Sequence, residues 1–117
     1  MSAADGQDVG ACADGNCEIA VSHPLTVRFK GPAGPATLSV TKLGPNTVEY
    51  TVKSGSGHSS GGAGGPGQGC ITVLRANGSG NSCGALGDGR PSRQPNAVVI
   101  QVATGQAGTA ILDIVSD

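Results

Sequence analysis

The chain has 117 residues, among them 21 glycines and 7 prolines, and it contains no tryptophan, one phenylalanine and one tyrosine. Seven basic and eight acidic residues leave a formal net charge of −1, which excludes the strong positive charge typical of proteins that bind nucleic acids or anionic membranes. The charge balance predicts no nucleic acid partner. No apolar run approaches the ~20 residues of a membrane-spanning helix, so we also expect no membrane span.

The N-terminal segment is rich in aspartate, glycine and alanine and shows no periodicity. It predicts an acidic arm over residues 1–16 that Cys12 ties down, followed by a single β domain over residues 17–117. Residues 1–10 are polar and lack the apolar core of a signal peptide. We expect that a secretion signal or an anchor precedes the domain in its gene.

Alternation of apolar and polar residues predicts the first strands. Apolar side chains alternate over residues 18–22 and again over 25–30, and His23-Pro24 separates the two runs. A hairpin follows, with one strand over 38–41, a reversal at residues 43–46 and a second strand over 48–53. The apolar face of this hairpin is expected to pack on a core and its polar face to meet water.

Glycine-rich segments interrupt the second half of the chain. Residues 54–69 read SGSGHSSGGAGGPGQG, a composition typical of flexible coil. A short strand is predicted over 71–75, and a second long loop over 76–96. Residues 97–102 and 109–115 carry consecutive apolar side chains, which predicts two strands that are central in a sheet, with residues 104–108 as the hairpin connection.

These patterns amount to about seven strands, and no segment has a convincing helical period. Short strands separated by turn signals predict an all-β fold, a small antiparallel β-sandwich or barrel with long glycine-rich loops. Large aromatic side chains are nearly absent, so crosslinks are the expected supplement to a small core.

Four cysteines provide two candidate crosslinks. Four residues separate Cys12 from Cys17, and twelve separate Cys70 from Cys83. Pairing within each of these two sets is the simplest of the three connectivities open to four cysteines, and bridges of this size contribute about 2–3 kcal/mol each in the chain-entropy model. A zinc site is the alternative, but the second spacing is too wide for a zinc knuckle, and no Cys-x-x-Cys redox motif is present.

Disulfides are typical of oxidising compartments, so we expect an extracellular or cell-envelope location. A cytosolic protein with four free thiols is the alternative. The Gly/Ala/Thr/Val bias of the chain is similar to that of small exported or surface-attached proteins of high-GC bacteria. This similarity extends over the whole chain and assigns no functional residue.

Catalytic and metal-binding constellations are weak. His58 stands beside Ser59 and Ser60, but a Gly/Ser coil cannot hold a nucleophile and a base in reactive geometry. The acidic residues near the N-terminus lack the spacing of a calcium-binding loop. We therefore expect no enzymatic activity, no cofactor and no metal site.

Basic residues are concentrated in one segment. Residues 28–53 hold four of them against the single acid Glu49, whereas the first eighteen residues hold four acids and no base. A solvated surface is the ordinary explanation for charge runs of this kind.

The sequence favours a non-enzymatic, extracytoplasmic domain that binds a ligand or is displayed at the cell envelope. Loops 54–69 and 76–96 are the predicted contact surface, because recognition commonly lies on the loops of a rigid scaffold. Arg75, Arg90 and Arg93 are the predicted binding residues, since arginine is enriched at binding hot spots. The expected partner is an unknown protein or envelope ligand, and the domain itself is expected to be a monomer.

Two alternatives stay open. A loop pinned by a Cys70–Cys83 bridge could inhibit a secreted hydrolase, because pre-organisation lowers the entropic cost of binding. An exposed edge strand could instead make the chain a self-associating structural subunit of the cell surface.

Overall fold

The computed structural model describes residues 10, 12, 16–31, 34–55, 57–65, 68–76, 78–85, 94–104 and 108–116. Over these residues the chain forms nine strands. Their bounds are β1 (Cys17–Val21), β2 (Leu25–Gly31), β3 (Gly34–Gly44), β4 (Thr47–Ser54), β5 (Gly57–Gly64), β6 (Gln68–Arg75), β7 (Gly78–Ala85), β8 (Ala97–Ala103) and β9 (Ala110–Ser116). Nowhere in these ranges does a helix occur that is long and apolar enough to cross a membrane.

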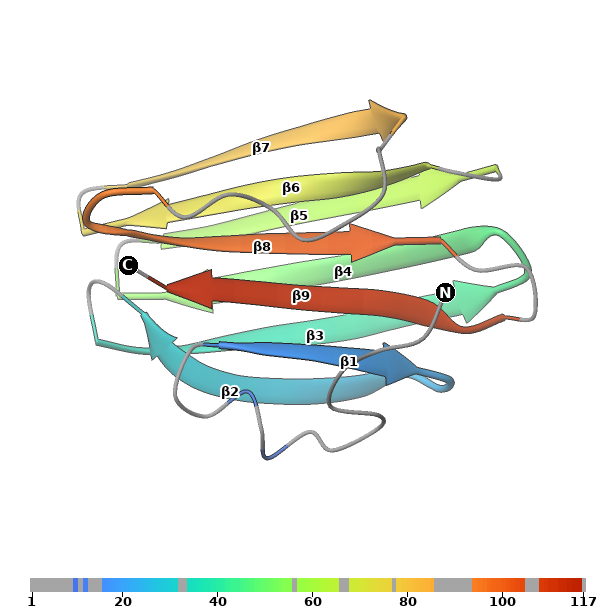
Figure 1. The fold of residues 1–117 in the computed structure, drawn as a ribbon, viewed down its shortest axis with the longest axis horizontal. Coiled ribbons are helices and arrows are strands. Elements are labelled where there is room, and N and C mark those ends of the chain that lie inside the picture. The colour runs from blue at the N-terminus through green and yellow to red at the C-terminus, as the bar shows by residue number, and fades with distance from the viewer. Residues whose placement is uncertain are drawn as a thin grey trace.

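Two antiparallel sheets lie face to face (Figure 1). One has five strands in the order β1-β9-β8-β6-β7, and the other has four in the order β2-β3-β4-β5. This arrangement confirms the predicted all-β fold with two packed antiparallel layers. Each strand predicted from alternation is present, because period-two burial against a single core leaves that pattern in the sequence.

The core lies between the two sheets. Every second side chain of β1, β2, β3, β4 and β6 is buried there, as alternation requires. Burying one large aliphatic or aromatic side chain contributes about 1.5–3 kcal/mol. The largest of these fully buried side chains are Tyr50, Ile19, Leu38, Leu74, Ile100, Leu112 and Ile114.

Strands β8 and β9 occupy the middle of the five-stranded sheet. Residues 97–102 of β8 and residues 110–114 of β9 are all buried, so both faces of these strands are covered. This confirms the prediction that their consecutive apolar residues mark central strands. Two polar side chains are included in this burial, Gln101 and Asp113, which are cross-strand partners.

A β-bulge in β3 keeps the hairpin of β3 and β4 in phase with the core. The register shifts between Val40 and Lys42, so Thr41 and Lys42 are both exposed. Leu43 then packs against the core opposite Val48. Without the extra residue, every side chain beyond Val40 would change face.

The predicted loops contain two strands that the sequence pattern did not reveal. Strand β5 pairs with β4 along its whole length, from Ser54↔Gly57 to Thr47↔Gly64, and β7 pairs in the same way with β6. The prediction of flexible coil over residues 54–69 is therefore wrong for residues 57–64, and the loop predicted over 76–96 is wrong for residues 78–85, while residues 86–93 lie outside the described ranges. The fold has nine strands rather than about seven for this reason.

Strands β5 and β7 lie at the side of the sandwich where the edges of the two sheets meet. Their small side chains allow the two strands to approach closely. Ser59 Oγ of β5 lies 2.6 Å from Ser79 Oγ of β7. Asn81 Nδ2 of β7 donates a hydrogen bond of 2.9 Å to the carbonyl oxygen of Ser60. Bulky residues would hold these strands apart, so backbone pairing and close approach replace side-chain burial here.

Both predicted disulfides are present. Cys12 is bonded to Cys17 at the start of β1, and Cys70 of β6 is bonded to Cys83 of β7. Cys70 and Cys83 are also register partners, so this bridge joins two paired strands and not a strand to a loop as predicted. No thiolate is left among the cysteines to bind zinc, and the two bridges are compatible with an extracellular or envelope location.

A group of three polar side chains, of which Tyr50 and Thr72 are buried and Asn81 is exposed, connects the two sheets and is here named the Tyr50 cluster. It comprises Tyr50 of β4, Thr72 of β6 and Asn81 of β7. The Tyr50 hydroxyl lies 2.8 Å from Thr72 Oγ1, and the Thr72 hydroxyl donates to Asn81 Oδ1 at 3.0 Å. Each buried hydroxyl thus has a partner, which removes the cost of burying it.

Burial raises the pKa of Tyr50 above its ordinary value of 10.0, and the hydrogen bond with Thr72 opposes this rise. The fold therefore favours the neutral phenol. We expect the resulting contribution to stability to be complete below pH 10 and to disappear as the pH rises through the pKa of the folded state. Chemical denaturation between pH 9 and pH 12, read beside the phenolate absorbance of the single tyrosine, measures this.

Tyr50→Phe serves as the reference for that titration. It should lose about 1 kcal/mol at neutral pH, because the hydrogen bonding of the Tyr50 hydroxyl with Thr72 Oγ1 and Asn81 Oδ1 is removed. It should also lose less stability than the parent protein above pH 10, since lysines titrate alike in both. Equal alkaline losses in the two proteins would contradict a raised Tyr50 pKa.

Candidate functional site

The outer face of the four-stranded sheet is polar along its length. Alternation turns the apolar residues of β2, β3 and β4 into the core and leaves hydroxyl and charged side chains outside. Charged residues face outward on both β2 and β4. The outward residues are Thr26, Arg28 and Lys30 on β2 and Glu49, Thr51 and Lys53 on β4. Over the described residues these side chains are exposed or half-buried, so they can contact a ligand.

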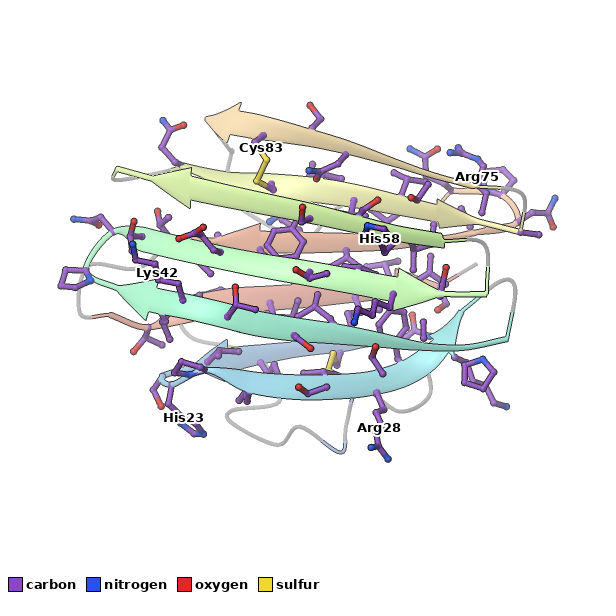
Figure 2. All side chains as sticks on the ribbon, turned by 180° about the vertical axis from the view of Figure 1, so that it is seen from behind. His23, Arg28, Lys42, His58, Arg75 and Cys83 are labelled. Carbon is purple, nitrogen blue, oxygen red and sulfur yellow. A yellow bond between two sulfur atoms is a disulfide. The ribbon has the colours of Figure 1, made fainter. Side chains whose placement is uncertain are left out.

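Strand register places Arg28, Lys53 and His58 in one row across this face, with Thr37 between Arg28 and Lys53. Arg28 of β2 pairs with Thr37 of β3, and Thr37 pairs in turn with Lys53 of β4. Lys53 then pairs with His58 of β5. These four residues are called the basic row below, and Figure 2 shows Arg28 and His58 on opposite edge strands at the same level along the sheet.

A second transverse row lies two residues along each strand from the basic row and carries only hydroxyl groups. It runs through Thr26, Ser39, Thr51 and Ser60, one residue from each strand. The hydroxyls of Thr26 and Ser39 lie 3.2 Å apart, within hydrogen-bond distance. These four residues are called the hydroxyl row. Each hydroxyl can both donate and accept, so the row offers several hydrogen bonds to a ligand.

The charge of the face is unbalanced. Residues 25–64 contain four of the seven bases and only one of the eight acids, Glu49, and the rest of the chain has a net charge of −4. Glu49 lies 3.7 Å from Lys42, away from the basic row, and both side chains are largely exposed. No carboxylate of the described residues comes within ion-pair distance of Arg28, Lys30 or Lys53.

A surface hollow of about 630 Å³ lies at the Arg28 and Lys53 end of the sheet. Arg28 lines one side, Lys53 the other, and Thr37 lies between them on the central strand. A second hollow of about 450 Å³ shares Arg28 and adds Lys30. Both hollows are also lined by Phe29 and Pro35, so part of their lining is apolar. Positive side chains around a concave surface focus their field on whatever occupies it, so this end of the face is suited to an anion.

The arginines predicted from the sequence lie elsewhere or outside the described residues. Arg75 is exposed at the end of β6, and its Nη2 donates to Gln94 Oε1 at 3.3 Å. Arg90 and Arg93 fall outside the described residues. Arg75 is therefore on the five-stranded sheet, and it does not join the basic row.

His58 also has a different setting from the one predicted. His58 lies in strand β5, whereas the sequence predicts a flexible coil there. The neighbouring Ser59 is on the opposite face of the strand, where its hydroxyl contacts Ser79. Within the described ranges, no three His, Cys, Asp or Glu side chains gather as a metal site would require.

Register is the information that the sequence pattern lacked. The cluster of bases over residues 28–53 is visible in the sequence, but its interpretation as solvated charge did not place any two of them together. His58 was assigned to a loop, so no strand pairing linked it to Lys53. Alternation in β2 and β4 identifies the outward residues, and only the pairing of four strands aligns them.

The face can bind an anionic, hydroxyl-bearing molecule through ionic contacts from one row and hydrogen bonds from the next. Comparisons with protein-family models, with curated proteins and with solved structures find no match for this chain. The function proposed below is therefore argued from the geometry of this face.

Proposed function

We propose that the chain is a non-enzymatic, extracytoplasmic binding domain that holds an anionic ligand against the outer face of its four-stranded sheet. The observation that carries the proposal is the basic row, in which Arg28 and Lys53 flank a hollow without a carboxylate partner among the described residues. The two disulfides support an oxidising location.

Charge distribution favours this face over the loops as the contact surface. A net charge of −1 for the whole chain conceals a strand-bound region that is positive. Residues held in a sheet are also fixed before binding, so less conformational entropy is lost on contact than with a loop. Arg75, Arg90 and Arg93 stay predictions for a second contact region.

The hydrolase-inhibitor alternative becomes a narrower prediction. Cys70 and Cys83 lie on the paired strands β6 and β7, so an inhibitory contact would use the end of this pair, where Arg75 is the register partner of Gly78. The self-association alternative would use β7, the outer strand of the five-stranded sheet. Neither has an observation comparable to the basic row in its favour.

Retention on a sulfonate resin tests the proposed function. At pH 7 and low salt, a protein of net charge −1 should flow through unless one face is strongly positive. We expect the parent protein to be retained, to elute as salt screens the contact, and the Arg28→Glu/Lys53→Glu variant to flow through. Amide shifts in an NMR titration with inorganic sulfate should then fall on β2, β3 and β4.

A charge-matched control separates this face from net charge. The Lys42→Glu/Arg75→Glu variant carries the same total charge as the Arg28→Glu/Lys53→Glu variant, but leaves the basic row intact. It should be retained longer than the row variant. Identical elution of the two variants, or sulfate-induced shifts elsewhere, would overturn the proposal that this face binds anions.

A further inference from the structure

We propose that the ligand of this face is an acidic polysaccharide that lies across the strands, with sugar residues over successive strands. This inference rests on the proposed anion-binding function and adds the class of ligand. It follows from two features of the face: the spacing of its cations and the hydroxyl row beside them.

The spacing of the basic row fits a chain of sugars. Neighbouring strands are about 4.8 Å apart, so the backbones at Arg28 and Lys53, two strands apart, are separated by about 10 Å. A pyranose residue in an extended polysaccharide advances by nearly the same distance as one strand spacing. A polymer across the sheet therefore brings one sugar over each strand and an anionic group over both Arg28 and Lys53.

The hydroxyl row supplies what a purely ionic site would lack. Thr26, Ser39, Thr51 and Ser60 lie two residues along each strand from the basic row, on the same face. A sugar whose carboxylate is held by the basic row has its ring hydroxyls within reach of this second row. Hydrogen bonds from aligned hydroxyls reward a ligand that carries many hydroxyls of its own.

The scarcity of aromatic side chains argues against a nucleic acid as the polymer. Single-stranded nucleic acids are bound by stacking their bases on aromatic rings. The chain has only Phe29 and Tyr50 as aromatic residues, and both are buried in the core. Phe29 lines the hollow beside Arg28 but is only 4 % exposed, so the face offers charge and hydroxyl groups and little aromatic surface on which a base can stack.

Calorimetric titration with oligogalacturonides of increasing length tests the inference. We expect the affinity to rise from the monomer to the tetramer, which spans the four strands, and to change little for longer chains. Thr51→Val keeps the charge of the face and removes one hydroxyl from the hydroxyl row. It should weaken tetramer binding by about fivefold, the ratio that one hydrogen bond represents. Neutral cello-oligosaccharides should bind at least tenfold more weakly than the uronides.

Linear polyphosphate and oligothymidylate are the comparison ligands. If either binds as tightly as the uronide tetramer and its affinity is unchanged by Thr51→Val, the face recognises charge alone. That result would overturn the polysaccharide inference and leave the proposed anion-binding function standing. If no anion binds, or if Arg28→Glu/Lys53→Glu binds all of them like the parent protein, the proposed function fails as well.

Discussion

Gly61→Ala is expected to lower the free energy of unfolding by about 1–3 kcal/mol, the cost typical of overpacking a filled core. In a domain of this size that corresponds to a fall in melting temperature of about 4–12 °C. Gly61 lies in β5, directly opposite Tyr50 in β4. A Cβ atom added there would lie 2.9 Å from both Cζ and Oη of the Tyr50 ring.

The Tyr50 ring has nowhere to move. It is only 1 % exposed, and its hydroxyl is held 2.8 Å from Thr72 Oγ1 on the facing sheet. The missing side chain of Gly61 therefore provides the space that the ring fills. Relief of the clash would require either the hydrogen bond within the Tyr50 cluster or the pairing of β4 with β5 to give way.

Gly80→Ala is the matched control for this experiment. Gly80 is also a strand glycine, in β7, but a Cβ atom there would meet nothing within 4 Å. We expect this variant to be as stable as the parent or more stable by up to about 1 kcal/mol, because alanine restricts the unfolded chain. A Gly61→Ala protein that denatures at the same urea concentration as Gly80→Ala would show that the ring does not depend on this glycine.

The same glycine explains how far the sequence could predict the fold. In strands such as β2 and β4, large apolar residues at every second position identify the buried face from the sequence alone. Strand β5 has no such pattern, because the side chain that fills its place in the core belongs to Tyr50 of the neighbouring strand. Glycine and serine are rare in strands in general, so composition alone predicted a coil.

The candidate site was hidden for a related reason. Arg28 and Lys53 are 25 positions apart in the sequence, and their alignment depends on the register of β3 between them. That register depends on the β3–β4 reversal, where Asn46 adopts a φ of 53°, and on the bulge after Val40. Alternation identifies which residues face outward, whereas turn geometry and the bulge decide which of them become neighbours.

The small residues of β5 and the charged residues beside them have one physical consequence in common. On the outer face of β5, the residues that follow His58 are Ser60, Gly62 and Gly64, so this edge of the four-stranded sheet carries little side-chain bulk. Such an edge leaves room for an extended ligand across the strands. The glycine-rich segment thereby contributes to the proposed binding face as a structured strand and not as a flexible loop.

Removing the Cys70–Cys83 bridge, with alanine at both positions, is expected to lower the free energy of unfolding by about 3 kcal/mol. The bridge closes a loop with a sequence separation of 13, and the entropy of an open loop of this length sets the size of the effect. The melting temperature should fall by about 12 °C. Cys12→Ala/Cys17→Ala opens a loop with a separation of 5 and should cost less, about 2 kcal/mol.

The two double variants should also differ in where the structure loosens. Among the described strands, β7 pairs with β6 alone, and its described side chains are mostly exposed, so little apolar burial holds it in place. Loss of the Cys70–Cys83 bridge should therefore speed hydrogen exchange of the β7 amides while those of the central strands β8 and β9 stay protected. The Cys12→Ala/Cys17→Ala variant should leave β7 unchanged. Local opening requires that β7 separate from β6 while the core stays intact. Uniform loss of protection across both sheets in the first variant would therefore contradict this prediction. It would mean that the bridge stabilises the whole fold and does not specifically hold the edge strand.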